Sequence, residues 1–479
     1  MTLVTHIENI NQILAKNNYP KVEEIVELPS AGSARLYFRV FFEYYGHKPV
    51  LAAFNPEVNE NIAQYSFSMH FLKKGLNVPE IYAKDESYRY FLLQDLGDQT
   101  MLDAAASMKT GEKRKLYQKV LKQLLRFQTQ GIKGLDLDVA WPVKKFGPDN
   151  ILWDLNYFKY YFIKTHTIYF DELKLETDFR NLSKLLLAAK PGFFLYRDFQ
   201  ARNIMIHNGE PWFIDFQGGR QGPLVYDVVS LLYQAKANLM EGFRDELSDF
   251  YLDELKKQST NLAEDFKEHY HWFIWFRIMQ VMGAYGYRGK LQAKAHFLQS
   301  IPYVIKNIKI LLEQKPLGDG FAELKSVFMQ ICDLKEYELI TTIREKLQVN
   351  INSFSYKKGG YPIDISGNGG GFAFDCRALP NPGRYKNLKD FTGRDKMVID
   401  FLNEKPETKL FVNQAYTMVK QSIDNYLDRG FNNLQINFGC TGGKHRSVYC
   451  AEKIAGLIIG KYSERVIVSL RHQQLEKGI

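Results

Sequence analysis

The sequence has few cysteines and no long apolar segment, which argues against a disulfide-rich protein and against a membrane-spanning one. Its four cysteines, Cys332, Cys376, Cys440 and Cys450, form neither a disulfide framework nor a paired metal-ligand motif. The sequence contains no run of about 18 apolar residues, which is the length that would predict a membrane span. The N-terminal residues lack the basic and apolar regions of a secretory signal. We therefore expect a cytoplasmic protein with reduced thiols and no membrane contact.

The positive charge is concentrated in the last quarter of the chain. The net charge is +9, and from Lys346 to the end there are 20 Lys and Arg against 12 Asp and Glu, which gives +8 there and +1 for the first 345 residues. A basic region of this kind favours an anionic ligand, although a merely basic surface is an alternative. The length, 479 residues, predicts two to four domains.

Hydrophobic periodicity divides the chain into a strand-rich part, a helical part and an alternating part. Strand-like runs occupy 36–43 and 50–54, and the period is mostly helical from about residue 113 to 313. After two glycine-dense segments, apolar runs of strand length alternate with helical stretches, which is typical of an α/β domain. We predict a small lobe at 1–97, a helical lobe at 98–332, a connector at 333–348 and an α/β domain at 349–479.

The segment Tyr-Arg-Asp-Phe-Gln-Ala-Arg-Asn at 196–203 carries the clearest chemical signal. Asp198 precedes Asn203 by five residues, and Asp215 follows twelve residues after Asn203. Kinase-type phosphoryl transfer requires a carboxylate that accepts the proton of the attacking hydroxyl, and an asparagine and a second aspartate that bind Mg²⁺. We predict Asp198 as the catalytic base and Asn203 and Asp215 as metal ligands, with ATP and Mg²⁺ as cofactors. Asp227 either caps a helix or holds the catalytic loop by hydrogen bonds.

This part of the chain resembles the aminoglycoside phosphotransferase-like kinases, and it is most similar to the branch that phosphorylates N-acetylmuramic acid and N-acetylglucosamine. The similar pieces are Arg197-Asp198, 201–205, 214–217 and Gly-Pro-Leu-Val-Tyr-Asp at 222–227, within about residues 15–330. Residues 30–39 resemble the nucleotide-covering loop, and 94–97 the hinge. The resemblance implies a protein-kinase-like bilobal α+β fold, an amino-sugar substrate, and nucleotide contacts from Ser33, Arg35, Gln94 and Asp95.

Two departures from the kinase pattern stand out. Tyr196 occupies a position that is usually histidine, and residues 50–54, Val-Leu-Ala-Ala-Phe, lack the lysine that kinases place on the third strand to neutralise phosphates. Three cations, Arg35, Arg39 and Lys48, are candidates to replace it. Ordinary surface charge is the alternative for each of them.

A second motif, Gly-Cys-Thr-Gly-Gly-Lys-His-Arg-Ser at 439–447, lies between a strand-like run and a helical stretch. Glycines there let backbone N–H groups converge on an anion, and a helix N-terminus adds positive potential. The spacing is not a Walker motif. A cysteine six residues before an arginine also fits a phosphatase loop, with Cys440 as nucleophile, Arg446 as phosphate ligand, and Asp375 or Asp395 as the acid. Phosphate binding without chemistry is the simpler interpretation.

Residues 350–476 resemble the C-terminal domain of the RapZ RNase adapter family. The similar pieces are Ser-Phe-Ser-Tyr-Lys at 353–357, 374–382, 388–395, 439–447 and Arg471-His472. The resemblance implies binding of an amino-sugar phosphate, together with self-association into homo-oligomers and contact with RNA. The ligand residues that it implies are Cys440, Thr441, Gly442, Gly443, His445, Arg446 and Arg377.

Two hypotheses follow. In the first, the protein is an ATP-dependent amino-sugar kinase with a domain that senses a sugar phosphate. In the second, it is a regulatory adapter for RNA or protein with a degenerate kinase domain, as the missing lysine and Tyr196 suggest. Fold-level analogy alone cannot name the substrate.

Overall fold

A computed structural model describes residues 2–28, 34–44, 46–292, 294–337, 346–364, 371–429 and 431–476. The chain forms two compact units, residues 1–284 with 303–334, and residues 285–302 with 335–479. The sequence placed all of 98–332 in one helical lobe, whereas Tyr285–Pro302 groups with the second unit. Helical periodicity shows which face of a helix is buried but not the unit against which it packs, so this difference could not be foreseen. Among the residues described here, no helix has the length and hydropathy needed to cross a membrane.

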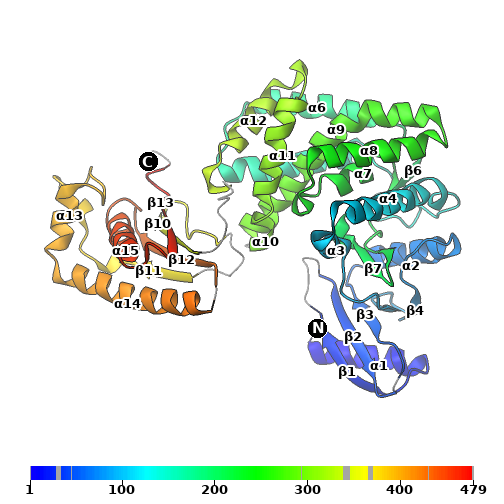
Figure 1. The fold of residues 1–479 in the computed structure, drawn as a ribbon, viewed down its shortest axis with the longest axis horizontal. Helices are drawn as coiled ribbons and strands as arrows, with labels where there is room; N and C mark the ends of the chain where they lie inside the picture. The colour runs from blue at the N-terminus through cyan, green and yellow to red at the C-terminus, as the bar shows by residue number, and fades with distance from the viewer. Residues whose placement is uncertain are drawn as a thin grey trace. The chain divides into compact units, whose positions relative to one another are not determined.

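The first unit begins with a five-stranded antiparallel sheet in the order β1-β2-β3-β5-β4 (Figure 1). β2 alternates buried and half-buried residues, as a strand with two unlike faces requires. One face of the sheet packs against α1 through Ile10, Ile13 and Leu14. On the other face, Ala53 and Leu93 pack with Tyr65 of α2. The elements of this lobe are α1 (Leu3–Lys16), β1 (Val22–Glu27), β2 (Leu36–Phe42), β3 (Val50–Phe54), α2 (Val58–Lys73), β4 (Ile81–Lys84) and β5 (Tyr90–Gln94).

A helical lobe follows, interrupted by two short antiparallel ribbons, β6 with β9 and β7 with β8. α4 buries Tyr117, Val120, Leu121, Leu124 and Leu125, which recur at helical spacing. The elements are α3 (Met101–Ser107), α4 (Thr110–Arg126), α5 (Pro148–Phe158), α6 (Glu172–Leu187), β6 (Phe193–Leu195), β7 (Ile204–His207), β8 (Glu210–Phe213), β9 (Arg220–Gly222), α7 (Val225–Leu232), α8 (Glu241–Lys256), α9 (Thr260–Tyr285), α11 (Ile301–Gln314) and α12 (Ala322–Cys332).

The second unit contains a four-stranded parallel sheet in the order β11-β12-β10-β13. The central strand β12 is buried along nearly its whole length, as parallel strands covered on both faces usually are. α14 packs against α15, and both contribute to the core of this unit. The elements are α10 (Ala295–Leu298), β10 (Leu347–Ser355), β11 (Gly371–Asp375), α13 (Lys396–Asn403), α14 (Pro406–Asp428), β12 (Asn433–Cys440), α15 (Arg446–Tyr462) and β13 (Val466–His472). The predicted α+β bilobal kinase-like domain, followed by a smaller α/β domain, is confirmed.

At Gly283, the backbone of α9 lies close to the backbone of α5. A Cβ atom there would lie 2.7 Å from the backbone nitrogen of Phe158 and 2.9 Å from the carbonyl carbon of Tyr157. Backbone atoms of α5 cannot move aside as a flexible side chain can. We predict that Gly283→Ala lowers the free energy of unfolding by about 1–3 kcal/mol, measured by chemical denaturation. Gly242→Ala in α8 is the control, because no heavy atom lies within 4 Å of its Cβ. Equal stability of the two variants would contradict the close contact.

Candidate active site

A buried carboxylate holds the predicted catalytic loop in place. Asp227, in the first turn of α7, accepts hydrogen bonds from the backbone N–H groups of Tyr196 at 2.7 Å and Arg197 at 3.0 Å. Gln128 also approaches this carboxylate, at 3.5 Å, and donates to the carbonyl of Leu224 at 2.9 Å. Of the two roles predicted for Asp227, support of the loop is therefore the one observed, since the residue that caps α7 is Leu224. Burial raises the pKa of Asp227 to about 7.

Asn203 brings the other two predicted residues together. Its Nδ2 donates to the backbone carbonyl of Asp198 at 2.9 Å and to the Asp215 carboxylate at 3.0 Å. One amide group thus ties the catalytic loop to the segment after β8. The spacing read from the sequence corresponds to one site in space.

The backbone at this site is held in conformations that side chains disfavour. Arg197 has φ 79° and Asp215 has φ 68°. Each such conformation costs on the order of 1–3 kcal/mol and persists only where the surroundings impose it. Burial and the neighbouring charge of Asp198 raise the pKa of Asp215. A cation at this position would relieve both the burial cost and the repulsion between the carboxylates.

The oxygen atoms of Asn203 and Asp215 suit Mg²⁺, which takes oxygen ligands and commonly uses one or two carboxylates together with phosphate oxygens. Among the described ranges, no group of three or more His, Cys, Asp or Glu side chains could hold a metal. The oxygen atoms of Asn203 and Asp215 are thus suited to hold a metal ion together with nucleotide phosphates.

Tyr196 supports the same loop in place of the usual histidine. Its side chain is buried, and its hydroxyl donates to the carbonyl of Ile214 at 2.7 Å. Ile214 directly precedes Asp215, so this bond fixes the backbone that carries the predicted metal ligand. The substitution leaves the site assembled.

The four residues predicted to contact nucleotide have different surroundings. Ser33 lies outside the described residues. Arg35 is buried beside Glu60, at 3.0 Å, and Asp215, at 3.6 Å. The Gln94 side chain accepts from the backbone of Glu80, whereas the carboxylate of Asp95 forms two hydrogen bonds with Arg39.

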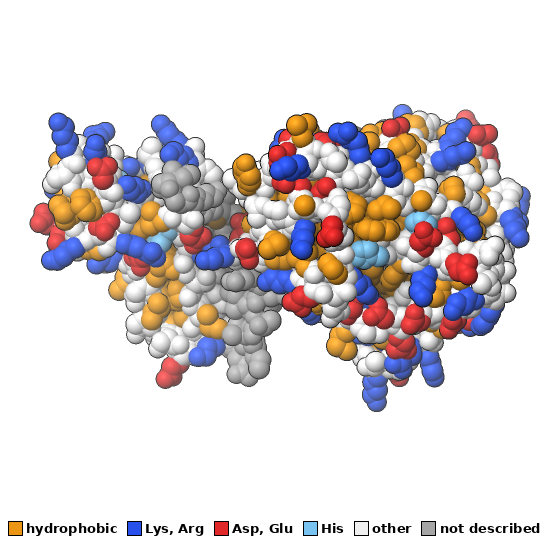
Figure 2. Space-filling model, turned by 90° about the horizontal axis from the view of Figure 1, so that it is seen from above, with side chains coloured by type: hydrophobic (Ala, Val, Ile, Leu, Met, Phe, Trp, Pro, Cys, Tyr) orange, Lys and Arg blue, Asp and Glu red, His pale blue; other side chains and the backbone are white. Residues whose placement is uncertain are grey.

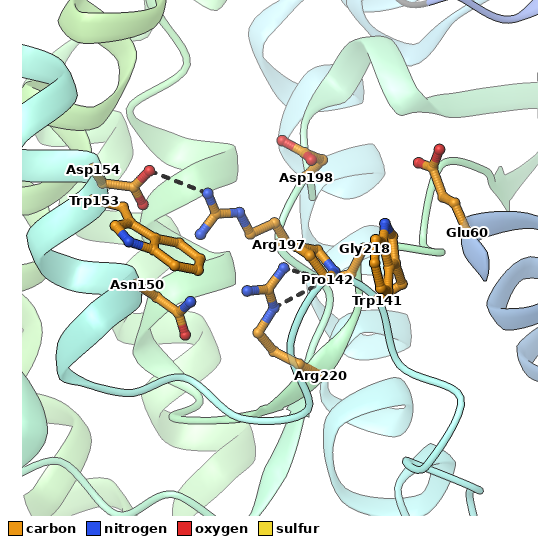
Figure 3. A pocket seen from close by; sticks show the side chains of 10 residues that line it. All are labelled: Glu60, Trp141, Pro142, Asn150, Trp153, Asp154, Arg197, Asp198, Gly218 and Arg220. Carbon is orange, nitrogen blue, oxygen red and sulfur yellow. Dashed lines mark hydrogen bonds and ion pairs between the residues drawn. The ribbon is translucent and has the colours of Figure 1, made fainter. Parts of the chain in front are cut away.

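A cavity of about 320 Å³ opens beside Asp198 (Figure 3). In this view the indole rings of Trp141 and Trp153 lie on either side of the guanidinium groups of Arg197 and Arg220. Arg197 donates to Asp154 at 3.2 Å, and its Nη1 atom is buried with no hydrogen-bond partner in the described structure. Burial and the charge of Arg197 lower the pKa of Arg220 to about 10. The cavity is lined by Glu60, Trp141, Pro142, Asn150, Trp153, Asp154, Arg197, Asp198, Gly218 and Arg220.

The second unit carries the predicted glycine-rich loop at the carboxyl end of β12. The Sγ atom of Cys440 accepts from the backbone N–H of Gly443 at 3.2 Å and lies 3.1 Å from the hydroxyl of Ser447. Ser355, paired with Cys440 across the sheet, donates to the carbonyl of Thr441 at 2.7 Å. Gly442 is exposed, and a Cβ atom there would meet nothing within 4 Å. The loop is thus fixed at its base and open at its tip, and ligands of open parallel sheets bind beyond this edge.

Arg446 is the best placed of the predicted ligand residues. It is buried, and its Nη1 donates to the carbonyls of Arg377 at 2.8 Å and Leu379 at 3.0 Å. Its Nη2 lies 3.5 Å from Thr441 Oγ1. The Nε atom of Arg446 and the Nε2 atom of His445 are buried with no hydrogen-bond partner among the described residues. Buried donors of this kind are costly unless they bind something, and an anion would satisfy them.

Arg377 touches the loop through its backbone rather than its charge. Its guanidinium is paired with Asp375 at 2.7 Å and lies over the ring of Tyr356. The pairing lowers the pKa of Asp375, and hydrogen bonds from Thr392 lower the pKa of Asp395. Both carboxyl groups are therefore ionised at neutral pH and are poor proton donors. Neither candidate acid supports the phosphatase interpretation of Cys440.

The two units match two known families. Residues 38–264 match the phosphotransferase enzyme family. Residues 347–476 match the RapZ C-terminal domain. The two matches fall in separate parts of the chain, and the part that resembles the phosphotransferases has the protein-kinase-like fold.

Curated relatives are named nucleotide-binding proteins. One from Thermosipho melanesiensis is 31% identical over 175 residues, which cover 35% of this chain and 59% of the relative. One from Moorella thermoacetica is 36% identical over 138 residues, which cover 29% of this chain and 43% of the relative. The chain thus spans about half the length of these relatives.

Solved structures of small-molecule kinases are similar at low identity. An ADP-bound aminoglycoside phosphotransferase is 15% identical, with a TM-score of 0.42, and the match covers 60% of this chain and 91% of that structure. Choline kinase LicA from Streptococcus pneumoniae is 11% identical, with a TM-score of 0.42, and the match covers 68% and 99%.

Several residues of the site were not predicted from the sequence. Glu60 on α2, Gln217 after Asp215, and the two tryptophans are the clearest examples. Glu60 could have been sought as the helix glutamate that normally pairs with the strand lysine, but the missing lysine removed that signal. The tryptophans lie in a region without a motif, so nothing marked them.

The raised pKa of Asp227 can be tested by measuring stability at several pH values. Its pKa is raised in the folded state to about 7 and lies near 3.9 when unfolded. Between these values the folded protein holds a proton that the unfolded chain has released, so this group makes stability fall as pH rises, by at most about 1.4 kcal/mol per pH unit. We predict that Asp227→Asn flattens the decline in stability of the first unit between pH 4 and 7, measured by denaturation at several pH values. The exposed Asp253→Asn is the control. An unchanged slope in Asp227→Asn would mean that Asp227 is ionised throughout.

Proposed function

We propose that this protein is an ATP-dependent kinase that phosphorylates a hydroxyl group of a small sugar, most specifically an amino sugar, and that its second domain binds a sugar phosphate. The observation that carries the proposal is the bridge that Asn203 makes between Asp198 and Asp215 beside a cavity. Phosphoryl transfer depends chiefly on positioning and charge, and these residues supply both.

Different residues of the chain would carry out different parts of the reaction. The acceptor hydroxyl would lie in the cavity, where Asp198 accepts its proton as it attacks the γ-phosphate. Asn203 and Asp215 would hold Mg²⁺, which when bound neutralises charge on the phosphates. Asp227 and Tyr196 keep the loop in the geometry that this attack requires. Such preorganisation can contribute several kcal/mol to catalysis.

The nucleotide would bind between the strands of the first lobe and the catalytic loop. The hinge at Gln94 and Asp95 would contact the base through its backbone, because the Asp95 side chain is engaged by Arg39. Arg35 would contact the phosphates, together with Ser33 of the covering loop. ATP-dependent chemistry on small metabolites fits the cytoplasm, where we expect the protein to reside.

The size and the lining of the cavity support a small sugar as the acceptor. About 320 Å³ is near the lower limit of ligand cavities, which suits a single sugar ring better than a multi-ring antibiotic. Two guanidinium groups line it beside the carboxylates of Glu60, Asp154 and Asp198, so the hydroxyl groups of a sugar would meet both hydrogen-bond donors and acceptors. The indole faces of Trp141 and Trp153 offer apolar surfaces for a sugar ring, and the partnerless Nη1 atom of Arg197 can donate to a hydroxyl or acetamide oxygen.

The second domain would bind the phosphate group of its ligand in the loop at 440–446. The buried guanidinium of Arg446 supplies positive charge beside His445, and the N-terminus of α15, where this loop ends, supplies backbone N–H groups, which together are what a phosphate requires. Sugar hydroxyls would extend past the exposed Gly442. The second domain would thus report the level of a phosphorylated amino sugar, with self-association of the protein as one route for the signal.

The adapter hypothesis with a degenerate kinase domain is not favoured. The site is assembled despite Tyr196, and a buried arginine lies close to the predicted metal ligand. Figure 2 shows the second domain at the left, where Lys and Arg side chains are interspersed with Asp and Glu on the visible face. On this face the positive charge does not form the unbroken basic patch that is typical of nucleic-acid binding.

Asp198→Asn tests the kinase assignment. We expect the rate of ATP-dependent sugar phosphorylation to fall about 10²- to 10⁴-fold, because the amide cannot accept the proton. N-acetylglucosamine and N-acetylmuramate are the expected acceptors, with kanamycin and choline as poor ones. The exposed Asp249→Asn is the control. Turnover that is equal in both variants, or absent with all of these acceptors in the unmodified protein, would contradict the assignment.

Arg446→Lys tests the phosphate loop. Lysine keeps the charge but loses the planar fork that reaches both the carbonyls and an anion. We expect the affinity for glucosamine-6-phosphate to fall at least about tenfold, which is about 1.4 kcal/mol, measured by calorimetry on the full chain. Exposed Arg384→Lys is the matched control. Equal affinity in the two variants would remove Arg446 from the ligand site.

A further inference from the structure

The third strand of the first lobe carries no cation for the nucleotide phosphates. β3 reads Val-Leu-Ala-Ala-Phe, and its Ala52 and Ala53 are buried. Kinases place a lysine on this strand, pair it with a glutamate of the following helix, and use it to neutralise phosphate charge. In this chain Glu60 on α2 corresponds to that glutamate, but the strand has no lysine to pair with it.

Arg35 occupies the place of the missing partner. It lies directly before β2, with its side chain buried, and its Nη2 is 3.0 Å from Glu60 Oε1. Its Nη1 is 3.6 Å from Asp215 Oδ1. The second distance is that of an ion pair rather than a close hydrogen bond, so the same edge of the guanidinium can also approach a phosphate oxygen. Arg35 thus connects the helix glutamate with the predicted metal ligand.

Hydrogen bonds from Asn55 and Gln217 hold Glu60 and Asp215 in place around Arg35. Glu60 Oε2 accepts from Asn55 Nδ2 at 2.9 Å, and Asp215 Oδ1 accepts from Gln217 Nε2 at 2.7 Å. Gln217 Nε2 also lies 3.4 Å from Glu60 Oε1. Glu60, Arg35, Asp215 and Gln217 therefore form a closed ring of contacts. A cation held in this way loses little side-chain entropy when a ligand arrives.

The other two candidate cations have different positions. Arg39 forms hydrogen bonds with both oxygens of Asp95 and with Asp98 at 2.9 Å, which places its charge at the hinge. Lys48 is exposed. Among the three cations considered from the sequence, Arg35 is the one that contacts both Glu60 and Asp215.

We propose that Arg35, held by Glu60, binds the phosphates of the nucleotide in place of the strand lysine, and that it couples the position of α2 to that of Asp215. The proposal rests on the kinase function proposed above and specifies how this site recognises a nucleoside di- or triphosphate. Arginine suits the position because its fork can bind a carboxylate on one edge and a phosphate on another, which a single ammonium group cannot do.

The test separates phosphate recognition from nucleoside recognition. The affinities of adenosine, ADP and ATP are measured by calorimetry, with and without Mg²⁺, for the unmodified protein and for Arg35→Ala. We expect ADP and ATP to bind at least tenfold more weakly to the variant, with adenosine unchanged. Lys48→Ala, which removes an exposed cation from the same lobe, is the control. Equal ATP affinity in Arg35→Ala and the unmodified protein, or an equal loss for adenosine, would overturn the proposal.

Moving the positive charge from position 35 to β3 provides a second test. Ala53 pairs with Tyr37 across β2 and β3, and Tyr37 shares a strand face with Arg35 two residues away. Arg35→Ala combined with Ala53→Lys therefore returns the cation to the strand on the appropriate face. We expect the double variant to recover part of the lost ATP affinity. A folded double variant, checked by circular dichroism, that binds ATP as weakly as Arg35→Ala would overturn the equivalence of Arg35 with the strand lysine. Absence of turnover with every acceptor tested, together with intact, Arg35-dependent ATP binding, would instead contradict the proposed kinase function and leave the role of Arg35 in nucleotide binding in place.

Discussion

The proposed kinase site depends on one buried carboxylate. Asp227 lies in the core of the helical lobe and accepts two backbone N–H groups from the catalytic loop. Burial works against its charge, whereas each donated hydrogen bond favours it, so the carboxylate and the loop stabilise each other. Without this acceptor, the left-handed backbone at Arg197 would have little to offset its cost. This contact holds the start of the loop that carries Asp198 and Asn203, and Asn203 and the Tyr196 hydroxyl connect that loop to the segment that carries Asp215.

The residues closest to the chemistry could be predicted because their spacing along the chain is short. Asp198, Asn203 and Asp215 lie within one loop and one ribbon, so local structure alone brings them together. Glu60 could not be found in the same way, because more than 130 residues separate it from Asp198, and only the packing of α2 onto the site reveals it. The tryptophans of the cavity are similar, since an aromatic residue carries no motif of its own.

The α/β domain was predictable for a different reason. Its strands are short apolar runs between helices, and the glycine-rich loop follows one of them directly, so the strand, turn and helix could be recognised together. The roles of individual residues were less visible. Arg377 looked like a ligand in the sequence, but its guanidinium is paired with Asp375, and only its carbonyl meets the loop. Sequence predicts which residues gather at a sheet edge, whereas the direction of each charged group depends on its neighbours.

The two proposed sites would bind anions in different ways, because one needs added cations and the other already contains one. The kinase site is built from the carboxylates of Asp198, Asp215 and Glu60, and these repel a nucleotide unless cations intervene. Arg35 and a metal that binds with the nucleotide would supply that charge, so affinity at this site should follow the metal concentration. The loop of the second domain already carries Arg446, whose buried Nε atom has no hydrogen-bond partner among the described residues. Because no carboxylate of that loop must be neutralised first, a phosphate can bind there without a metal. Under this proposal, the second domain would bind a phosphorylated ligand without the metal that the first site requires.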